Sequence, residues 1–112
     1  MVDQCYDFAA DCRVRIATDL LSHSWDPVVL AALRLGPLRR RELMTSMGGI
    51  TDKALTQSLR RLTERGLLDR TPTSTARHVE YVLSRLGESF VAGPMTALGT
   101  WALEHGDELL AR

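Results

Sequence analysis

Apolar residues recur every three or four positions over the first third of the chain, which is the spacing of one helical face. The first such stretch begins near Ala10 and has its apolar positions at Val14, Ala17, Leu20 and Leu21. The second has its apolar positions at Trp25, Val29, Leu30 and Leu33. Asp26 is placed to cap the second helix, Pro27 suits its first turn, and Gly36 with Pro37 ends it. The pattern predicts two helices before residue 38.

Two more helices are predicted after Pro37, separated by a glycine pair. The first, "LRRRELMTSM", is short and is ended by Gly48-Gly49. The second, "DKALTQSLRRLTER", spans residues 52–65 and repeats leucine on one face. Thr51 or Asp52 offers the N-cap oxygen, and Gly66 suits the left-handed residue that follows a helix.

The spacing changes from helical to alternating after Gly66. The runs "LLDRT" and "HVEYVLS" are typical of two short strands joined by "PTSTAR". Residues 86–110 return to helical spacing, with a break or kink predicted at Gly93-Pro94. The predicted order is therefore four helices, a two-stranded hairpin and a last helix.

A short helix, a turn, an amphipathic helix and a hairpin in this order are the layout of a winged helix-turn-helix. The predicted fold class is mainly α with a small β-hairpin (α+β). Because 112 residues can build one core but not two, we assign residues 1–112 to a single domain. Its predicted DNA-binding core is residues 25–84 with the wing at about 68–84, and residues 1–23 and 86–112 are the terminal helices.

Composition points to a soluble globular protein, since 45% of the residues are apolar and 25% are charged. No apolar run approaches the roughly 20 residues of a membrane span. The first residues carry acids and Cys5 where a secretory signal has basic and apolar regions, so we expect a cytoplasmic protein without a membrane partner. Three scattered histidines (His23, His78 and His105) and two cysteines seven apart indicate neither a metal site nor a cofactor.

The net charge of zero conceals a separation of charge along the chain. Between Arg34 and Arg77 there are ten Lys/Arg and four Asp/Glu, whereas the remainder carries four and ten. The middle of the chain is thus suited to a polyanionic partner.

The helix over residues 52–65 supplies the candidate DNA readers. Its outward positions hold glutamine, which can pair with adenine, and arginine or lysine, which can pair with guanine in the major groove. Short hydroxyl side chains such as Ser58 can reach phosphates, and arginines before this helix and in the wing can position the domain on the backbone. The predicted DNA-binding residues are Arg39, Arg40, Arg41, Thr51, Asp52, Lys53, Thr56, Gln57, Arg60, Arg61, Arg77 and His78.

Three alternatives stand beside sequence-specific DNA binding. The basic face can be an ordinary solvated surface, although the hairpin, the glycine turn and the charge separation argue against that. It can also bind an acidic protein, or DNA without sequence preference. An enzyme is not indicated, because the sequence shows no nucleophile–base pair, ligand cluster or phosphate-binding glycine loop.

Several segments together resemble the HxlR family, a branch of the MarR-like winged-helix transcription regulators of bacteria. The resemblance runs from Cys12 to about Gly106 and is carried by Cys12, Trp25, "VLAALRLGPLRRREL", "GGITDKALTQSLRRLTERGLLDR" and "VEYVLSRLGES". It implies a homodimer, held by the terminal helices, that binds an inverted repeat in double-stranded DNA. The chain departs from the family at Ser22-His23-Ser24, where a Gly-Gly-Lys triplet is common.

The last helix and the first cysteines are the candidate sites of assembly and regulation. A stripe that so small a monomer cannot bury favours pairing, and we assign the dimer interface to Met95, Leu98, Trp101, Ala102 and Leu109. The resemblance implies that Cys12 senses electrophiles, quinones or oxidants. Arg13 and Arg15 favour its thiolate and Asp11 opposes it, and a buried structural thiol is the alternative. A disulfide between Cys5 and Cys12 of a second subunit, or a small-molecule effector, is a further option.

Overall fold

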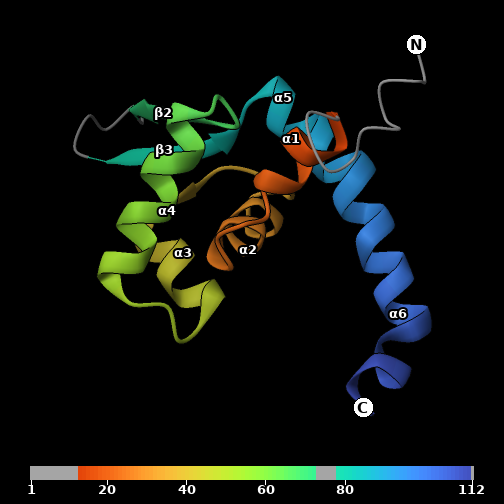
Figure 1. Cartoon of the computed structure of the whole chain (residues 1–112). Helices are drawn as coiled ribbons and strands as arrows, with labels where there is room; N and C mark the ends of the chain where they lie inside the picture. The colour runs from red at the N-terminus through yellow and green to blue at the C-terminus, as the bar shows by residue number, and fades with distance from the viewer. Residues whose placement is uncertain (1–12, 73–77, 112) are drawn as a thin grey trace.

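The computed structural model describes residues 13–72 and 78–111, so Cys5, Cys12 and Arg77 lie outside the described residues. Figure 1 shows the order of the elements. They are α1 (Arg13–Asp19), α2 (Trp25–Ala32), β1 (Leu38–Arg39), α3 (Arg40–Met47), α4 (Asp52–Glu64), β2 (Leu68–Pro72), β3 (Val79–Leu83), α5 (Arg85–Phe90), the π-helical turn η2 (Val91–Met95) and α6 (Thr96–Leu110). The predicted mainly helical fold with a small sheet is confirmed.

The core lies between α2, α3, α4 and the start of the sheet. It is built mainly of leucine, and its buried members include Val29, Leu30, Leu33, Leu43, Leu55, Leu59, Leu62, Leu67 and Leu68. Burying one such side chain contributes about 1.5–3 kcal/mol, so the leucine face of α4 alone anchors that helix firmly. The predicted core positions of the second and fourth helices are confirmed.

The turn and the caps of α4 follow the residues that the sequence supplies. Thr51 is the N-cap, and its hydroxyl accepts a hydrogen bond from the Ala54 amide at 3.0 Å. Gly66 follows the helix with φ +81°, which a residue with a side chain adopts at a cost. Gly49 takes φ +86° in the turn between α3 and α4 for the same reason. Both ends of α4 are therefore fixed by local chemistry.

The sheet has three strands rather than the predicted two. Leu38 and Arg39 were predicted as the start of a helix, but they form β1 and pair with β3 in the order β1-β3-β2. All pairs are antiparallel, with Arg70 opposite Tyr81 and Leu68 opposite Leu83. This third strand brings the start of α3 against the base of the wing.

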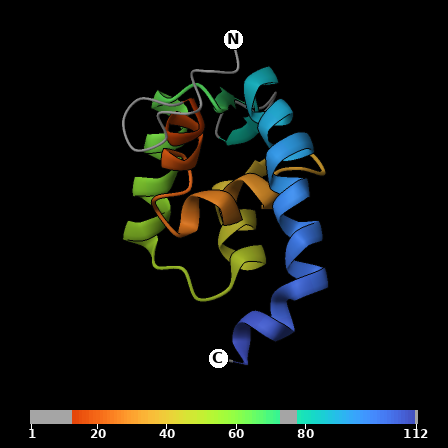
Figure 2. The ribbon, with the colours of Figure 1, turned by 45° about the vertical axis from the view of Figure 1, so that its right-hand side comes forward.

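The α-helical pattern is interrupted around Pro94, where a break or kink was predicted: α5 ends at Phe90, and α6 begins at Thr96. The turn η2 accommodates the proline, and the Thr96 hydroxyl donates to the Val91 carbonyl at 2.8 Å. In Figures 1 and 2, α6 runs along the outside of the molecule, away from α4. Within the described part of the chain, none of the residues of α6 is buried.

Candidate nucleic-acid interface

Helix α4 presents one apolar and one polar face, as its sequence predicts. Its buried residues are Leu55, Ser58, Leu59 and Leu62. Lys53, Thr56, Gln57 and Arg60 are exposed on its outer side. The outer face therefore offers two cations, an amide and a hydroxyl, which are the side chains that hydrogen-bond to base edges and phosphates.

Arg40 ties the start of α4 to the start of α3. Its Nη2 donates to the Asp52 carbonyl at 2.9 Å, to Asp52 Oδ1 at 2.7 Å and to Thr56 Oγ1 at 2.7 Å. The pair is exposed to solvent, so it adds little stability, and it links the start of α3 to the start of α4. Three predicted DNA-binding residues are thus brought together, and part of their hydrogen-bonding capacity is used within the protein.

Two basic grooves flank this arrangement. One of about 580 Å³ lies between the start of α3 and the sheet, and its basic lining residues are Arg39, Arg40, Arg41, Arg70 and His78. The other, of about 470 Å³, lies between α4 and the sheet, and its basic lining residues are Arg40, Arg60 and Arg70. Six of the predicted DNA-binding residues therefore border the grooves, since Thr56 also lines the second one, and these grooves connect α4 to the base of the wing.

Sequence reasoning missed Arg70, which lines both grooves. The signal that finds it is the two-residue period of β2. Leu68 is buried, and Arg70 follows two residues later, so both lie on the same face of the sheet. That face is packed against α4, and Arg70 lines the second groove together with Arg60.

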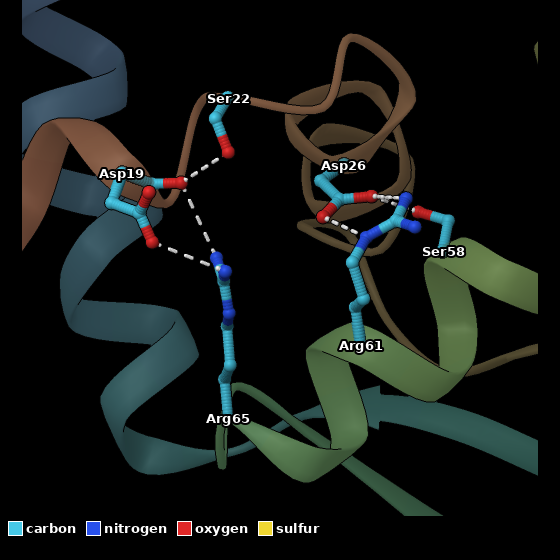
Figure 3. Close-up of polar contacts among 6 residues, drawn as sticks. All are labelled: Asp19, Ser22, Asp26, Ser58, Arg61 and Arg65. Carbon is cyan, nitrogen blue, oxygen red and sulfur yellow. Dashed lines mark hydrogen bonds and ion pairs between the residues drawn. The ribbon is translucent and has the colours of Figure 1, made fainter.

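Two residues predicted to face DNA instead point into the protein (Figure 3). Ser58 is fully buried, and its hydroxyl donates to Asp26 Oδ1 at 2.6 Å. Arg61 donates from Nη2 to Asp26 Oδ1 at 2.7 Å and from Nε to Oδ2 at 3.0 Å. The predictions that Arg61 projects outward and that Ser58 reaches a phosphate are therefore wrong, because both side chains donate to the buried carboxylate of Asp26.

Asp26 was itself predicted to be the N-cap of α2, and that is also wrong. The N-cap is Ser24, and Asp26 lies in the first turn of α2 with none of its surface exposed. The hydrogen bond that Asp26 accepts raises the pKa of Arg61, burial lowers it, and the negative charge of Asp26 raises it further. The net shift is upward, so Arg61 stays charged throughout the physiological pH range.

Residues 20–109 match the sequence profile of the HxlR-like helix-turn-helix proteins. The chain belongs to the HxlR-like helix-turn-helix family. A relative of this HxlR-like protein is the uncharacterized HTH-type transcriptional regulator YtfH of Escherichia coli strain K12. The two are 36% identical over 105 residues, which are 93% of this chain and 82% of YtfH.

Solved structures of other regulators have the same fold. The transcriptional regulator YtfH from Salmonella typhimurium is 36% identical, with a TM-score of 0.73 and 93% of each chain covered. The reduced form of the transcriptional regulator YodB from Bacillus subtilis is 25% identical, with a TM-score of 0.73, and the match covers 80% of this chain and 88% of YodB. YodB has also been solved with quinone bound. The HxlR-like protein is accordingly a DNA-binding transcriptional regulator, and its relatives are named as regulators.

The stripe predicted on the last helix of this HxlR-like protein is largely exposed. Leu98 and Trp101 each expose 51% of their surface and Leu109 exposes 58%, whereas Met95 is half-buried against the core. The Trp101 ring stacks on His105 with centroids 4.7 Å apart. Among residues 13–72 and 78–111, no helix combines the length and apolar character of a membrane span.

Proposed function

We propose that this HxlR-like regulator binds an inverted-repeat operator as a homodimer, with one α4 helix in the major groove of each half-site. The observation that carries the proposal is the exposed row of Lys53, Gln57 and Arg60 on α4, flanked by two basic grooves. We assign the contacts with the phosphate backbone to Arg39, Arg41 and Arg70, and at the wing to Arg77 and His78.

Homodimer formation is supported by the exposed apolar face of α6. Leu98, Trp101 and Leu109 leave an apolar surface that residues 13–72 and 78–111 of one copy do not cover. Pairing through residues 1–23 and 86–112 leaves residues 25–84 of each copy free to bind one half-site. A two-fold axis in the protein then matches a two-fold axis in the operator.

The regulator is proposed to respond to a thiol-reactive effector, an oxidant or a quinone. The support is the quinone-bound form of YodB, together with Cys12 and its neighbour Arg13, whose charge favours a thiolate. Because residues 1–23 belong to the proposed dimer interface, modification of Cys12 changes the spacing of the two α4 helices. A cytoplasmic location follows from DNA as the partner.

The experiment compares binding to DNA that flanks the regulator's own gene with binding to a scrambled duplex of equal length. The wild type should prefer the first duplex, and its affinity should fall steeply with salt. Gln57→Ala should reduce the preference by roughly 5- to 100-fold, since a good side-chain–base pair contributes about 1–3 kcal/mol. The protein should remain a folded dimer.

Arg70→Gln provides the contrasting variant, because an arginine on a phosphate carries no base information. It should weaken binding to both duplexes equally and reduce the slope of log affinity against log salt by roughly 0.9 for each phosphate that is no longer neutralised. Arg34→Gln is the matched control, since Arg34 is exposed but does not line either groove. Strong salt dependence without preference for either duplex would instead favour the non-specific or protein-binding alternative.

A further inference from the structure

A buried carboxylate connects α2 to the inner side of the recognition helix (Figure 3). Asp26 is 0% exposed, and both of its oxygens accept hydrogen bonds from α4. Oδ1 accepts from Ser58 and Arg61, and Oδ2 accepts from Arg61. Arg61 therefore binds the carboxylate through two nitrogens in one plane, which is the most geometrically restrictive form of an ion pair.

This ion pair is poorly explained as a source of stability. Removing a carboxylate from water costs several kcal/mol, and well-packed apolar residues in its place are often equally stable or more stable. Leucines already hold α4 against the core on either side of Ser58. Leucine contacts do not fix the rotation of α4 about its axis, because the energy of an apolar contact depends weakly on orientation. The energy of a bidentate hydrogen bond depends on orientation strongly.

The inner and outer faces of α4 are coupled through a single turn of helix. Gln57 and Arg60, the proposed DNA readers, immediately precede Ser58 and Arg61 in the sequence. A rotation of α4 by about 20° moves side-chain atoms about 6 Å from the axis by about 2 Å. That displacement exceeds the range of distances over which a hydrogen bond to a base edge forms.

A second ion pair on the same helix provides a comparison. Arg65, one turn after Arg61, donates to Asp19 at the end of α1, with Nη2 3.2 Å from Oδ2. The Asp19 side chain is 65% exposed, so water competes for it and the pair restricts the helix weakly. The Arg61–Asp26 and Arg65–Asp19 pairs thus join the same residue types at the same helix, but only the first has a buried carboxylate.

We propose that Asp26 is a positioning residue, which sets the rotation of α4 about its axis and so determines which base edges Gln57 and Arg60 can reach. The inference rests on the proposed function of α4 as the DNA reader. It goes beyond that function by assigning operator discrimination in part to a residue that does not touch DNA.

The test measures the ratio of affinities for the operator and a scrambled duplex, together with the free energy of unfolding. Asp26→Asn keeps the shape of the side chain but removes the charge and one acceptor, and it should reduce the affinity ratio by roughly tenfold. Binding to the scrambled duplex should change by less than about twofold, because phosphate contacts tolerate small rotations. Asp19→Asn is the matched control and should leave the ratio at the wild-type value.

A triple variant, Asp26→Leu with Ser58→Ala and Arg61→Met, separates positioning from stability. Replacing the whole cluster by apolar residues should leave the protein folded and near wild-type stability. Positioning predicts that its affinity ratio is still reduced roughly tenfold. If Asp26→Asn fails to fold, the affinity ratio of this triple variant still tests whether Asp26 positions α4.

Two results would overturn the proposed role of Asp26, and only one of them would also refute the proposed function. If the wild type prefers the operator and the triple variant keeps that preference, Asp26 is only structural and the proposed function stands. If the wild type shows no preference for any flanking sequence, the proposed function fails and the role of Asp26 fails with it.

Discussion

Replacing Gly87 by alanine should loosen the junction between the DNA-binding core and the C-terminal helix. Gly87 is buried in α5, and a Cβ atom there would lie 2.2 Å from the Leu67 carbonyl oxygen and 3.4 Å from Leu83 Cδ2. Helix α5 must therefore move by about 1 Å to restore an ordinary contact distance. The backbone of Leu67 cannot yield instead without disturbing the end of α4.

The hydrogen bonds of Ser84 oppose that movement. Its hydroxyl donates to the Gly66 carbonyl at 2.6 Å, its amide donates to the Leu67 carbonyl at 3.0 Å, and its oxygen accepts from the Gly87 amide at 3.0 Å. Overpacking costs about 1–3 kcal/mol. Two weakened hydrogen bonds add about 1 kcal/mol each. The free energy of unfolding should therefore fall by about 3–5 kcal/mol.

The assay is urea unfolding followed by circular dichroism at one fixed protein concentration, because assembly couples stability to concentration. Gly99→Ala is the matched control, since Gly99 lies within α6 and a Cβ there meets no atom of the described residues within 4 Å. Alanine is the better helix former by about 1 kcal/mol, so this control should be unchanged or more stable. A Gly87→Ala protein as stable as the wild type would refute the reasoning.

Two further predictions concern assembly and sensing. Trp101→Ser should raise the dimer dissociation constant by roughly 30-fold or more in sedimentation velocity, because a buried interface tryptophan commonly contributes at least 2 kcal/mol; Leu35→Ser, at an apolar residue that is 89% exposed in the loop after α2, should leave it unchanged. If both variants have the dissociation constant of the wild type, the assignment of the dimer interface to α6 is wrong. Cys12→Ser should abolish the effect of a quinone on operator binding in an anisotropy assay, whereas Cys5→Ser should keep it. A Cys12→Ser protein that still responds excludes Cys12 as the sensor.

Patterns that depend on neighbours along the chain predicted the fold well. The leucine spacing of α4, the Thr51 cap and Gly66 all act locally, and the structure confirms each of them. The two-residue strand β1 was missed because its pairing partner, β3, lies about forty residues away in the sequence. A strand of that length has no period of its own to detect.

The inner side of α4 shows the limit of reasoning from residue types. Arg61 and Ser58 look like DNA contacts on a basic helix, and only the position of Asp26 more than thirty residues earlier reveals their role. No helical spacing relates α2 to α4, so the pairing depends on how the two helices cross. Arg70 is the opposite case, since the alternation of β2 contains the signal that places it toward α4.

Helix α6 has consequences for how much of this regulator a cell must make. It has 15 residues, and none of them is buried in the described structure of one chain. An isolated helix of that length is only marginally stable in water. Ordering of α6 and pairing of two chains are therefore one event under the proposed assembly. At a low copy number most chains would carry a frayed tail and occupy no operator, so occupancy rises with the square of expression rather than in proportion to it.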